Sequence, residues 1–246
     1  MKKIDKNLPI GVFDSGFGGL CVLKELTEFF PSESFIYFGD NQNAPYGNKS
    51  KKELKRLSIN ALNHLKAKGV KAVVIACNTL STNLYKYIKE KARVPVIKTL
   101  PPKSKDKRDC LICTVNTANS KYVKRHFKGI VLSSESLAKN IEENVFSLDG
   151  IDLSYLTSQI PLTTKRIILG CTHYHYLLDR IKKLTNLLVI DGYCGVKFTL
   201  YKKLKKHKLF SLQKNGNVTF VGESSQLNSK VYYSVLCKKD ESGQEF

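Results

Sequence analysis

Short apolar runs separated by amphipathic stretches recur along the whole chain, and this alternation constrains the fold more than any other feature. Runs of this length, bounded by polar and turn-forming residues, are typical of buried strands. Strands that alternate with helical stretches indicate an α/β fold. The runs expected to be strands are Ile10–Phe13, Phe35–Phe38, Ala72–Ala76, Val94–Ile97, Cys110–Thr114, Gly129–Leu132, Ile167–Leu169, Leu187–Ile190 and Val218–Val221.

Four amphipathic stretches between these runs are expected to be helices: Leu20–Phe30, Ser50–Lys68, Leu80–Ala92 and Tyr176–Leu184. The first ends at Pro31 and the second at Gly69, and both residue types commonly stop helices. Short strand-to-helix connections favour parallel strands with helices on both faces of the sheet. We therefore expect mostly parallel sheets that are covered on both sides.

Two polar segments have the composition of crossings between lobes. Residues 100–108 are rich in proline and charge, and residues 202–217 are basic. They predict a first α/β lobe made of residues 1–98 and 209–246, and a second α/β lobe made of residues 99–208. The two ends of the chain would then share one lobe.

One internal repeat places a cysteine at the same point of each predicted lobe. Cys77 ends the run KAVVIAC, and Cys171 ends the run RIILGC. Ligands bind at the carboxyl ends of strands in open α/β sheets, and helix N-termini there favour a thiolate or a carboxylate. A lone buried cysteine is more often a core residue. Two in matching settings favour a pair that faces one cleft, so we expect two similar lobes with the active site between them.

Length and composition limit the class of protein. With 246 residues, of which 42% are hydrophobic, the chain has enough apolar material for a buried core, which excludes a mostly disordered chain. Its apolar runs are too short to span a bilayer, and the first residues lack a signal-peptide pattern. We expect a soluble, cytoplasmic protein with no membrane partner and with its seven cysteines reduced.

The charge is strongly basic, with 41 basic against 21 acidic residues and a net charge of +20. A nucleic-acid-binding protein is therefore the second hypothesis. However, 35 of the basic residues are lysines, which are spread along the chain, whereas bidentate contacts to bases and phosphates favour arginine. Nucleic acid is for these reasons not the expected partner.

A glycine-rich turn and two cysteine patterns suggest cofactor or metal sites that we consider weaker hypotheses. Residues 13–19, FDSGFGG, follow the first strand, but Cys21 breaks the G-x-G-x-x-G pattern of dinucleotide-binding proteins. Cys110 and Cys113 have C-x-x-C spacing inside an apolar run, without a second pair. The pattern C-x-H-x-H at 171–175 crosses a strand-to-helix turn, so its side chains would not share a face. We predict no metal site.

Four segments resemble the signature motifs of glutamate racemases, which belong to the aspartate/glutamate racemase superfamily: Gly11–Gly16, Tyr37–Asp40 with Pro45–Gly47, Ala76–Thr79 and Leu169–Tyr174. Weaker matches are residues 114–120 and 137–144. The order and the spacing of these motifs agree with the family over nearly the whole chain. Each motif alone is weak, but together they are specific.

The resemblance implies cofactor-independent racemisation of glutamate by a homodimeric isomerase that supplies D-glutamate for peptidoglycan. Inversion of a stereocentre by proton exchange needs a base on one face and an acid on the other, and two identical groups can exchange these roles. On this resemblance Cys77 and Cys171 serve opposite faces of the substrate. Asp14 and His173 would assist one thiol each, although a turn cap and a core histidine are the structural alternatives.

The resemblance also implies a set of substrate-binding residues: Asp14, Ser15, Tyr46, Gly47, Asn78, Thr79, Thr117, Thr172 and His173. Asp40 and Glu142 are possible auxiliary groups, and the alternative for both is pairing with surface lysines. An aspartate racemase of the same superfamily is the alternative within the enzyme class, but these tend to have Glu where this chain has His173.

Overall fold

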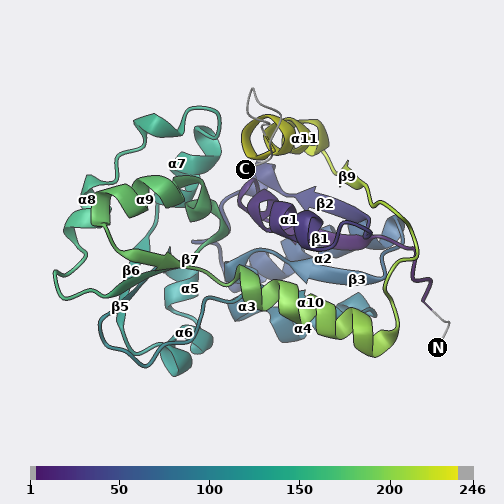
Figure 1. The fold of residues 1–246 in the computed structure, drawn as a ribbon, viewed down its shortest axis with the longest axis horizontal. Coiled ribbons are helices and arrows are strands. Elements are labelled where there is room, and N and C mark those ends of the chain that lie inside the picture. Colours follow the sequence, from purple (N-terminus) through teal and green to yellow (C-terminus); the bar gives the residue numbers. More distant parts are fainter. Residues whose placement is uncertain (1–3, 238–246) are drawn as a thin grey trace.

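The computed structural model describes residues 4–237, which form two separate parallel sheets flanked by helices (Figure 1). The first sheet has the order β4-β3-β1-β2-β9, and its strands are β1 (Ile10–Asp14), β2 (Phe35–Gly39), β3 (Ala72–Ile75), β4 (Val96–Lys98) and β9 (Val218–Val221). The second has the order β6-β5-β7-β8, with strands β5 (Asp109–Thr114), β6 (Ile130–Ser134), β7 (Arg166–Gly170) and β8 (Leu188–Ile190). The predicted α/β class is confirmed.

Helices cover both faces of the first sheet because alternate strand residues point to opposite sides. Val12 and Tyr37 lie in one core cluster with α1 and α10, and Phe13 and Phe38 lie in another with α2. Burial on both faces is why these strands are apolar throughout. The helices around this sheet are α1 (Gly18–Phe29), α10 (Tyr193–His207) and α11 (Ser225–Val231) on one face, and α2 (Lys51–Ala67), α3 (Asn78–Asn83) and α4 (Tyr85–Ala92) on the other.

The second sheet repeats this arrangement with shorter helices. Cys110 packs with the helices on one face and Cys113 with those on the opposite face, and both side chains are fully buried. The C-x-x-C spacing thus belongs to two core clusters. The helices are α7 (Leu137–Glu143), α8 (Ser154–Ser158) and α9 (Leu178–Thr185) on one side, and α5 (Val115–Ala118) and α6 (Lys121–His126) on the other.

Two predicted helices differ in detail from the structure. The stretch expected at Leu80–Ala92 forms α3 and α4 with a break at Leu84, where the hydroxyl of Thr82 and the amide of Asn83 bond the preceding backbone carbonyls. Side chains that compete for backbone groups in this way weaken a helix interior. The stretch expected at Tyr176–Leu184 begins inside a 3₁₀ helix, which ends at Leu177, and becomes α-helical only in α9. The remaining short elements are η1 (Asn41–Asn43), η2 (Leu148–Gly150), η3 (Thr172–Leu177) and η4 (Tyr232–Leu236).

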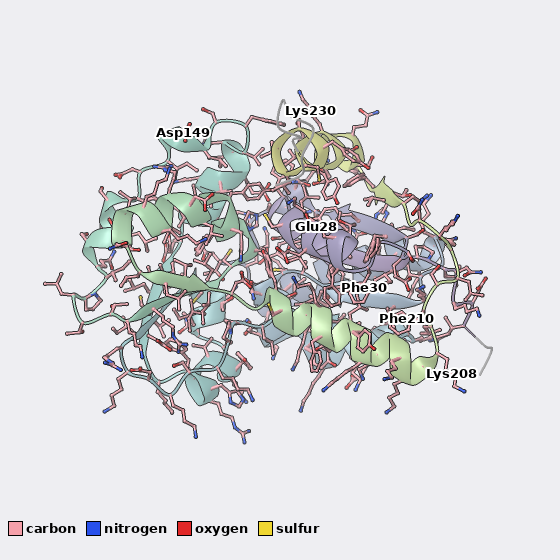
Figure 2. All side chains as sticks on the ribbon, in the orientation of Figure 1. Glu28, Phe30, Asp149, Lys208, Phe210 and Lys230 are labelled. Carbon is pink, nitrogen blue, oxygen red and sulfur yellow. The ribbon has the colours of Figure 1, made fainter. Side chains whose placement is uncertain are left out.

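Helix α10 packs on the first sheet, although the predicted limits of the lobes assign it to the second. Its residues Val196, Leu200 and Leu204 lie in the same core cluster as α1. The helix ends at Lys208, and the chain then folds back so that the ring centroid of Phe210 lies 5.4 Å from that of Tyr201 (Figure 2). The boundaries themselves stay predictions, and this packing favours a return crossing just before α10.

Within residues 4–237 no helix is both long and apolar enough to cross a membrane. The same part of the chain contains no group of three or more His, Cys, Asp or Glu side chains arranged to hold a metal ion. Basic side chains occur around both lobes in Figure 2.

A buried ion pair ties the amino edge of the first sheet together. Lys71, which is 0% exposed, pairs with Glu33, and its ammonium group also donates to the backbone carbonyl of Lys6 at 2.5 Å. The second carboxylate oxygen of Glu33 accepts the backbone N–H of Ser211 at 2.8 Å. The pair thus joins four segments that are far apart in the sequence.

We predict that Glu33→Gln lowers the free energy of unfolding by about 3–5 kcal/mol, because it leaves the buried Lys71 ammonium without its counter-charge. Urea unfolding followed by circular dichroism measures this change. Glu143→Gln is the matched control, because Glu143 pairs with Lys139 on the surface, where the two side chains are 59% and 62% exposed. It should change the same free energy by less than about 0.5 kcal/mol. Equal effects of the two substitutions would contradict the argument.

Candidate active site

Both repeated cysteines line one small cavity between the carboxyl ends of the two sheets. Cys77 follows β3 of the first sheet, and Cys171 follows β7 of the second. The cavity has a volume of about 10 Å³, roughly the room that one water molecule needs. Its lining residues are Ser15, Pro45, Tyr46, Gly47, Cys77, Asn78, Thr79, Thr114, Ala138, Cys171, Thr172 and His173.

Cys77 stands at the N-terminus of α3 with 4% of its surface exposed. Burial raises the pKa of its thiol well above the ordinary value, and the nearby charge of Asp14 raises it further. Hydrogen bonds from the backbone N–H groups of Leu80 and Thr79 act in the opposite direction and favour the thiolate. With these neighbours Cys77 is therefore a protonated thiol at neutral pH.

Cys171 is in contact with a buried histidine–glutamate pair. Its Sγ lies 3.7 Å from Nδ1 of His173, and Nε2 of His173 lies 2.6 Å from Oε1 of Glu142. Burial by itself lowers the pKa of His173, but the hydrogen bonds to Cys171 and Glu142 outweigh it, so the pKa lies well above its usual range. An imidazolium here donates one proton towards the sulfur and the other to the carboxylate.

Glu142 reaches this position because the glycine turn of the first lobe leaves room for it. Its Oε1 also accepts the backbone N–H of Phe17 at 2.6 Å, and its Oε2 accepts Nδ2 of Asn41 at 3.1 Å. A Cβ on Gly16 would stand 1.7 Å from Oε1, and one on Gly18 would stand 2.6 Å from Nδ1 of His173. The space that these glycines leave is occupied by side chains of the second lobe rather than by a dinucleotide.

Asp14 lies one hydrogen bond behind the cavity wall. Its carboxylate accepts the hydroxyl of Ser15 at 3.1 Å, the backbone N–H of Gly16 at 3.2 Å and the hydroxyl of Thr172 at 3.3 Å. The side chain is 0% exposed, and burial raises its pKa, whereas the positive charge of His173 lowers it in part. The Thr172 bond links Asp14 of the first lobe to the second.

Asp40 and Glu142 are both in buried networks rather than in surface pairs with lysine. Asp40 is 7% exposed, accepts the hydroxyl of Tyr46 at 2.5 Å and accepts Nδ2 of Asn43 at 2.9 Å. It therefore fixes the Tyr46 ring at the cavity wall. Glu142 lies on the Cys171 side, as described above.

All but one of the remaining predicted residues line the cavity, and Thr117 lies behind its wall. Thr79 lines the cavity, and its hydroxyl is 3.0 Å from that of Thr114, which in turn donates to Thr117 at 3.1 Å. Thr117 itself is fully buried behind Thr114. Asn78 lines the cavity and donates Nδ2 to the carbonyl of Thr99 at 3.2 Å. Ser15, Gly47 and Thr172 also line it.

Sequence reasoning missed several residues of this site. Thr114 ends β5, so the rule that ligands bind at the carboxyl ends of strands could have found it. Pro45 and Ala138 line the cavity, and Asn41 holds Glu142. The sequence carries no separate signal for Asn41, because its partner lies about a hundred residues further along the chain.

The chain was compared with known proteins. A glutamate racemase of Clostridium novyi is 36% identical over 233 residues, which cover 86% of this chain and 89% of that protein. The glutamate racemase of Francisella tularensis, solved with D-glutamate, superposes with a TM-score of 0.78 at 28% identity over 94% and 95% of the two chains. The glutamate racemase of Thermus thermophilus, solved with beta-chloro-D-alanine, superposes with a TM-score of 0.77 at 28% sequence identity. The match covers 92% of this chain and 93% of that chain. No protein-family model matches the chain.

The two parallel sheets and their match to these structures define an α/β racemase fold. With 36% identity over most of both sequences, the chain belongs to the glutamate racemase family and is an isomerase. The family predicted from the motifs is thereby confirmed. The roles of individual residues stay predictions.

We predict that Asp14→Asn lowers the pKa of Cys77, because it removes a negative charge that disfavours the thiolate. Alkylation of Cys77 by iodoacetamide at pH 8 should become several-fold faster, since only the thiolate reacts. Peptide mass spectrometry measures the rate, with the exposed Cys194 as internal control. Ser15→Ala is the matched variant, because it removes a bond to Asp14 and keeps the charge. A Cys77 rate unchanged by Asp14→Asn would show that this charge does not act on the thiol.

Proposed function

We propose that this chain interconverts L- and D-glutamate without a cofactor, by proton exchange with Cys77 and Cys171. The observation that carries the proposal is that the two thiols line one cavity from opposite lobes. A substrate held between them would present one face of its α-carbon to each sulfur. Membership of the family supports glutamate as the substrate.

The reaction is balanced by the two sulfurs alone. One cysteine, as the thiolate, removes the α-proton and becomes a thiol, while the C–H electron pair is left on the α-carbon. The other cysteine, as the thiol, donates its proton to the opposite face and becomes the thiolate. The product is the mirror image, and the enzyme is ready for the reverse direction. At each step one cysteine is the thiolate and the other is the thiol.

The surrounding groups would adjust the protonation of each thiol. His173, held as the imidazolium by Glu142, stands beside Cys171 and would stabilise its thiolate. Asp14 lies on the Cys77 side, where its charge favours the protonated thiol. The ammonium group of a bound amino acid brings positive charge into the cavity, and this would favour the thiolate that removes the proton.

Polar groups at the cavity wall are suited to an amino acid with two carboxylates. The hydroxyl of Thr79 lies at the wall, and the N-terminus of α3 attracts negative charge. The hydroxyls of Ser15 and Thr172 donate to Asp14 in this structure and would have to turn from it to donate to the substrate. We propose that they bind the substrate together with the remaining predicted residues. Tyr46 is fixed by Asp40 and would set the length of the substrate that fits.

Binding would require the lobes to separate. The cavity takes about one water molecule, whereas glutamate has about ten non-hydrogen atoms. The lobes are joined near the cavity by hydrogen bonds that opening would break. Asn116 donates to the carbonyls of Tyr46 and Lys49 at 3.2 and 2.9 Å, and Asn48 donates to that of Glu135 at 3.1 Å. Closure over the substrate would exclude water from the reacting carbon.

Two finer expectations rest on the family resemblance, a third rests on the composition of the chain, and all three stay proposals. The D-glutamate formed would supply peptidoglycan synthesis. The protein would act as a homodimer, and it would work in the cytoplasm. Nucleic-acid binding remains the alternative from another functional class, supported only by the net charge.

We predict that the dialysed protein converts L-glutamate to the racemic mixture with no cofactor added. Polarimetry should show the optical rotation of L-glutamate fall to zero. L-aspartate in a parallel sample should change much more slowly. Faster conversion of aspartate would favour the alternative substrate, and activity that requires added pyridoxal phosphate would overturn the two-cysteine proposal.

We predict that Cys77→Ser and Cys171→Ser each abolish racemisation but retain one-sided chemistry, because removal of a proton needs only one base. With an analogue of glutamate that has a leaving group at C3, each variant should catalyse elimination from one enantiomer. The two variants should act on opposite enantiomers, as measured by release of the leaving group. Cys110→Ser is the matched control, because this core cysteine lies outside the cavity lining. Preference of both variants for the same enantiomer would show that the thiols do not face opposite sides of the substrate.

A further inference from the structure

The Glu142 carboxylate is held by donors from both lobes. His173 belongs to its own lobe, whereas the backbone N–H of Phe17 and the side-chain amide of Asn41 belong to the other. Among the described residues of the first lobe, Asn41 alone bonds this carboxylate through its side chain. The two first-lobe bonds exist only while the lobes are together.

The Asn41 side chain lies close to Gly39 and Asn228. It begins η1 directly after Asp40, whose backbone N–H bonds the carbonyl of Asp14 at 3.2 Å. Its Oδ1 and the amide of the fully buried Asn228 both lie within 3.0 Å of the point where a Cβ on Gly39 would stand. Among the described residues Oδ1 of Asn41 is buried without a hydrogen-bond partner, so the bond from Nδ2 to Glu142 is the one that holds the amide. If the side-chain amide of Asn41 were rotated by half a turn, its Oδ1 would face Oε2 of Glu142, and two acceptors would be in contact.

We propose that Asn41 is a positioning residue, which locks the Glu142 carboxylate onto His173 only when the two lobes are closed. This inference deepens the proposed function and rests on it. Asn41 touches neither cysteine, so its effect on the reaction passes through Glu142 and His173. The active arrangement beside Cys171 would then be completed by the same motion that encloses the substrate.

The consequence concerns the proton on His173. The groups that face its ring are Cys171, Glu142 and, through its charge, Asp14. On opening, Glu142 loses the Phe17 and Asn41 donors and becomes free to turn away from the ring. His173 then loses the carboxylate that favours the imidazolium. Cys171 would therefore have a charged partner in the closed state and a weaker one in the open state.

Asn48 provides a matched control in the same loop. Its Nδ2 also bonds the second lobe, at 3.1 Å to the backbone carbonyl of Glu135, but it is exposed and reaches no group of the site. If Asn41 merely fastens the lobes together, Asn41→Ala and Asn48→Ala should behave alike. If Asn41 positions Glu142, they should differ.

The experiment compares Asn41→Ala, Asn41→Asp and Asn48→Ala with the wild-type protein. Loss of a hydrogen bond to a charged group predicts a fall in kcat of about tenfold to hundredfold in Asn41→Ala, with little change in KM. Asn41→Asp keeps the shape but replaces the donor with a second carboxylate, so kcat should fall at least as far. The deuterium isotope effect should rise for the one enantiomer whose α-proton passes to Cys171. Asn48→Ala removes only an exposed bond between the lobes, so any change should appear in KM, while kcat and the isotope effect stay unchanged.

A second measurement does not depend on turnover. With ¹³C-labelled histidine, the His173 signal can be assigned by its absence from the His173→Asn spectrum and titrated by NMR. In Asn41→Ala it should titrate at lower pH than in the wild type, and in Asn48→Ala it should not move. An unchanged titration in Asn41→Ala, or equal losses of kcat in the two alanine variants, would overturn the proposal. If the wild type does not racemise glutamate, the proposed function fails, while the titration still decides the role of Asn41.

Discussion

The close approach of the first glycine turn to the second lobe is the contact on which the site depends. Gly16 and Gly18 have no side chain, and so Glu142 can accept the backbone N–H of Phe17 next to α1, while His173 can pack against Gly18. A methyl group at Gly18 would stand 2.7 Å from the backbone nitrogen of His173 and push the lobes apart, whereas one at Gly16 would displace the Glu142 carboxylate. The glycines therefore determine how near the two cysteines stand, although neither glycine belongs to the cavity lining.

Burial then sets the chemistry of the groups that meet there. Removal from water raises the pKa values of Asp14 and Cys77, because burial disfavours the charged form of each group. His173 is the exception, because Glu142 and Cys171 compensate for its burial. The two cysteines, alike in sequence setting, thus have different neighbours. Cys77 lies near an anion and Cys171 near a cation, so the symmetry of the fold does not extend to the electrostatics.

The small cavity connects this chemistry to motion. A cavity with room for about one water molecule must open to admit an amino acid. Several hydrogen bonds around it join the two lobes. These contacts would break when the lobes open and form again when the lobes close. The acid/base group beside Cys171 would then be assembled only when the substrate is enclosed. Among the described residues, by contrast, no lysine or arginine lines the cavity.

The sequence by itself determined the local units: the strands, the turns after them, the two strand–cysteine–helix repeats and, by its motifs, the family. These features depend on neighbouring residues, so periodicity and turn chemistry reveal them. The sequence did not predict the break at Leu84, the packing of α10 on the first sheet, or the partners of Glu142. Those features join residues far apart in the chain. Only the tertiary structure decided them, because which side chains meet across a cleft depends on how two separately folded sheets come together.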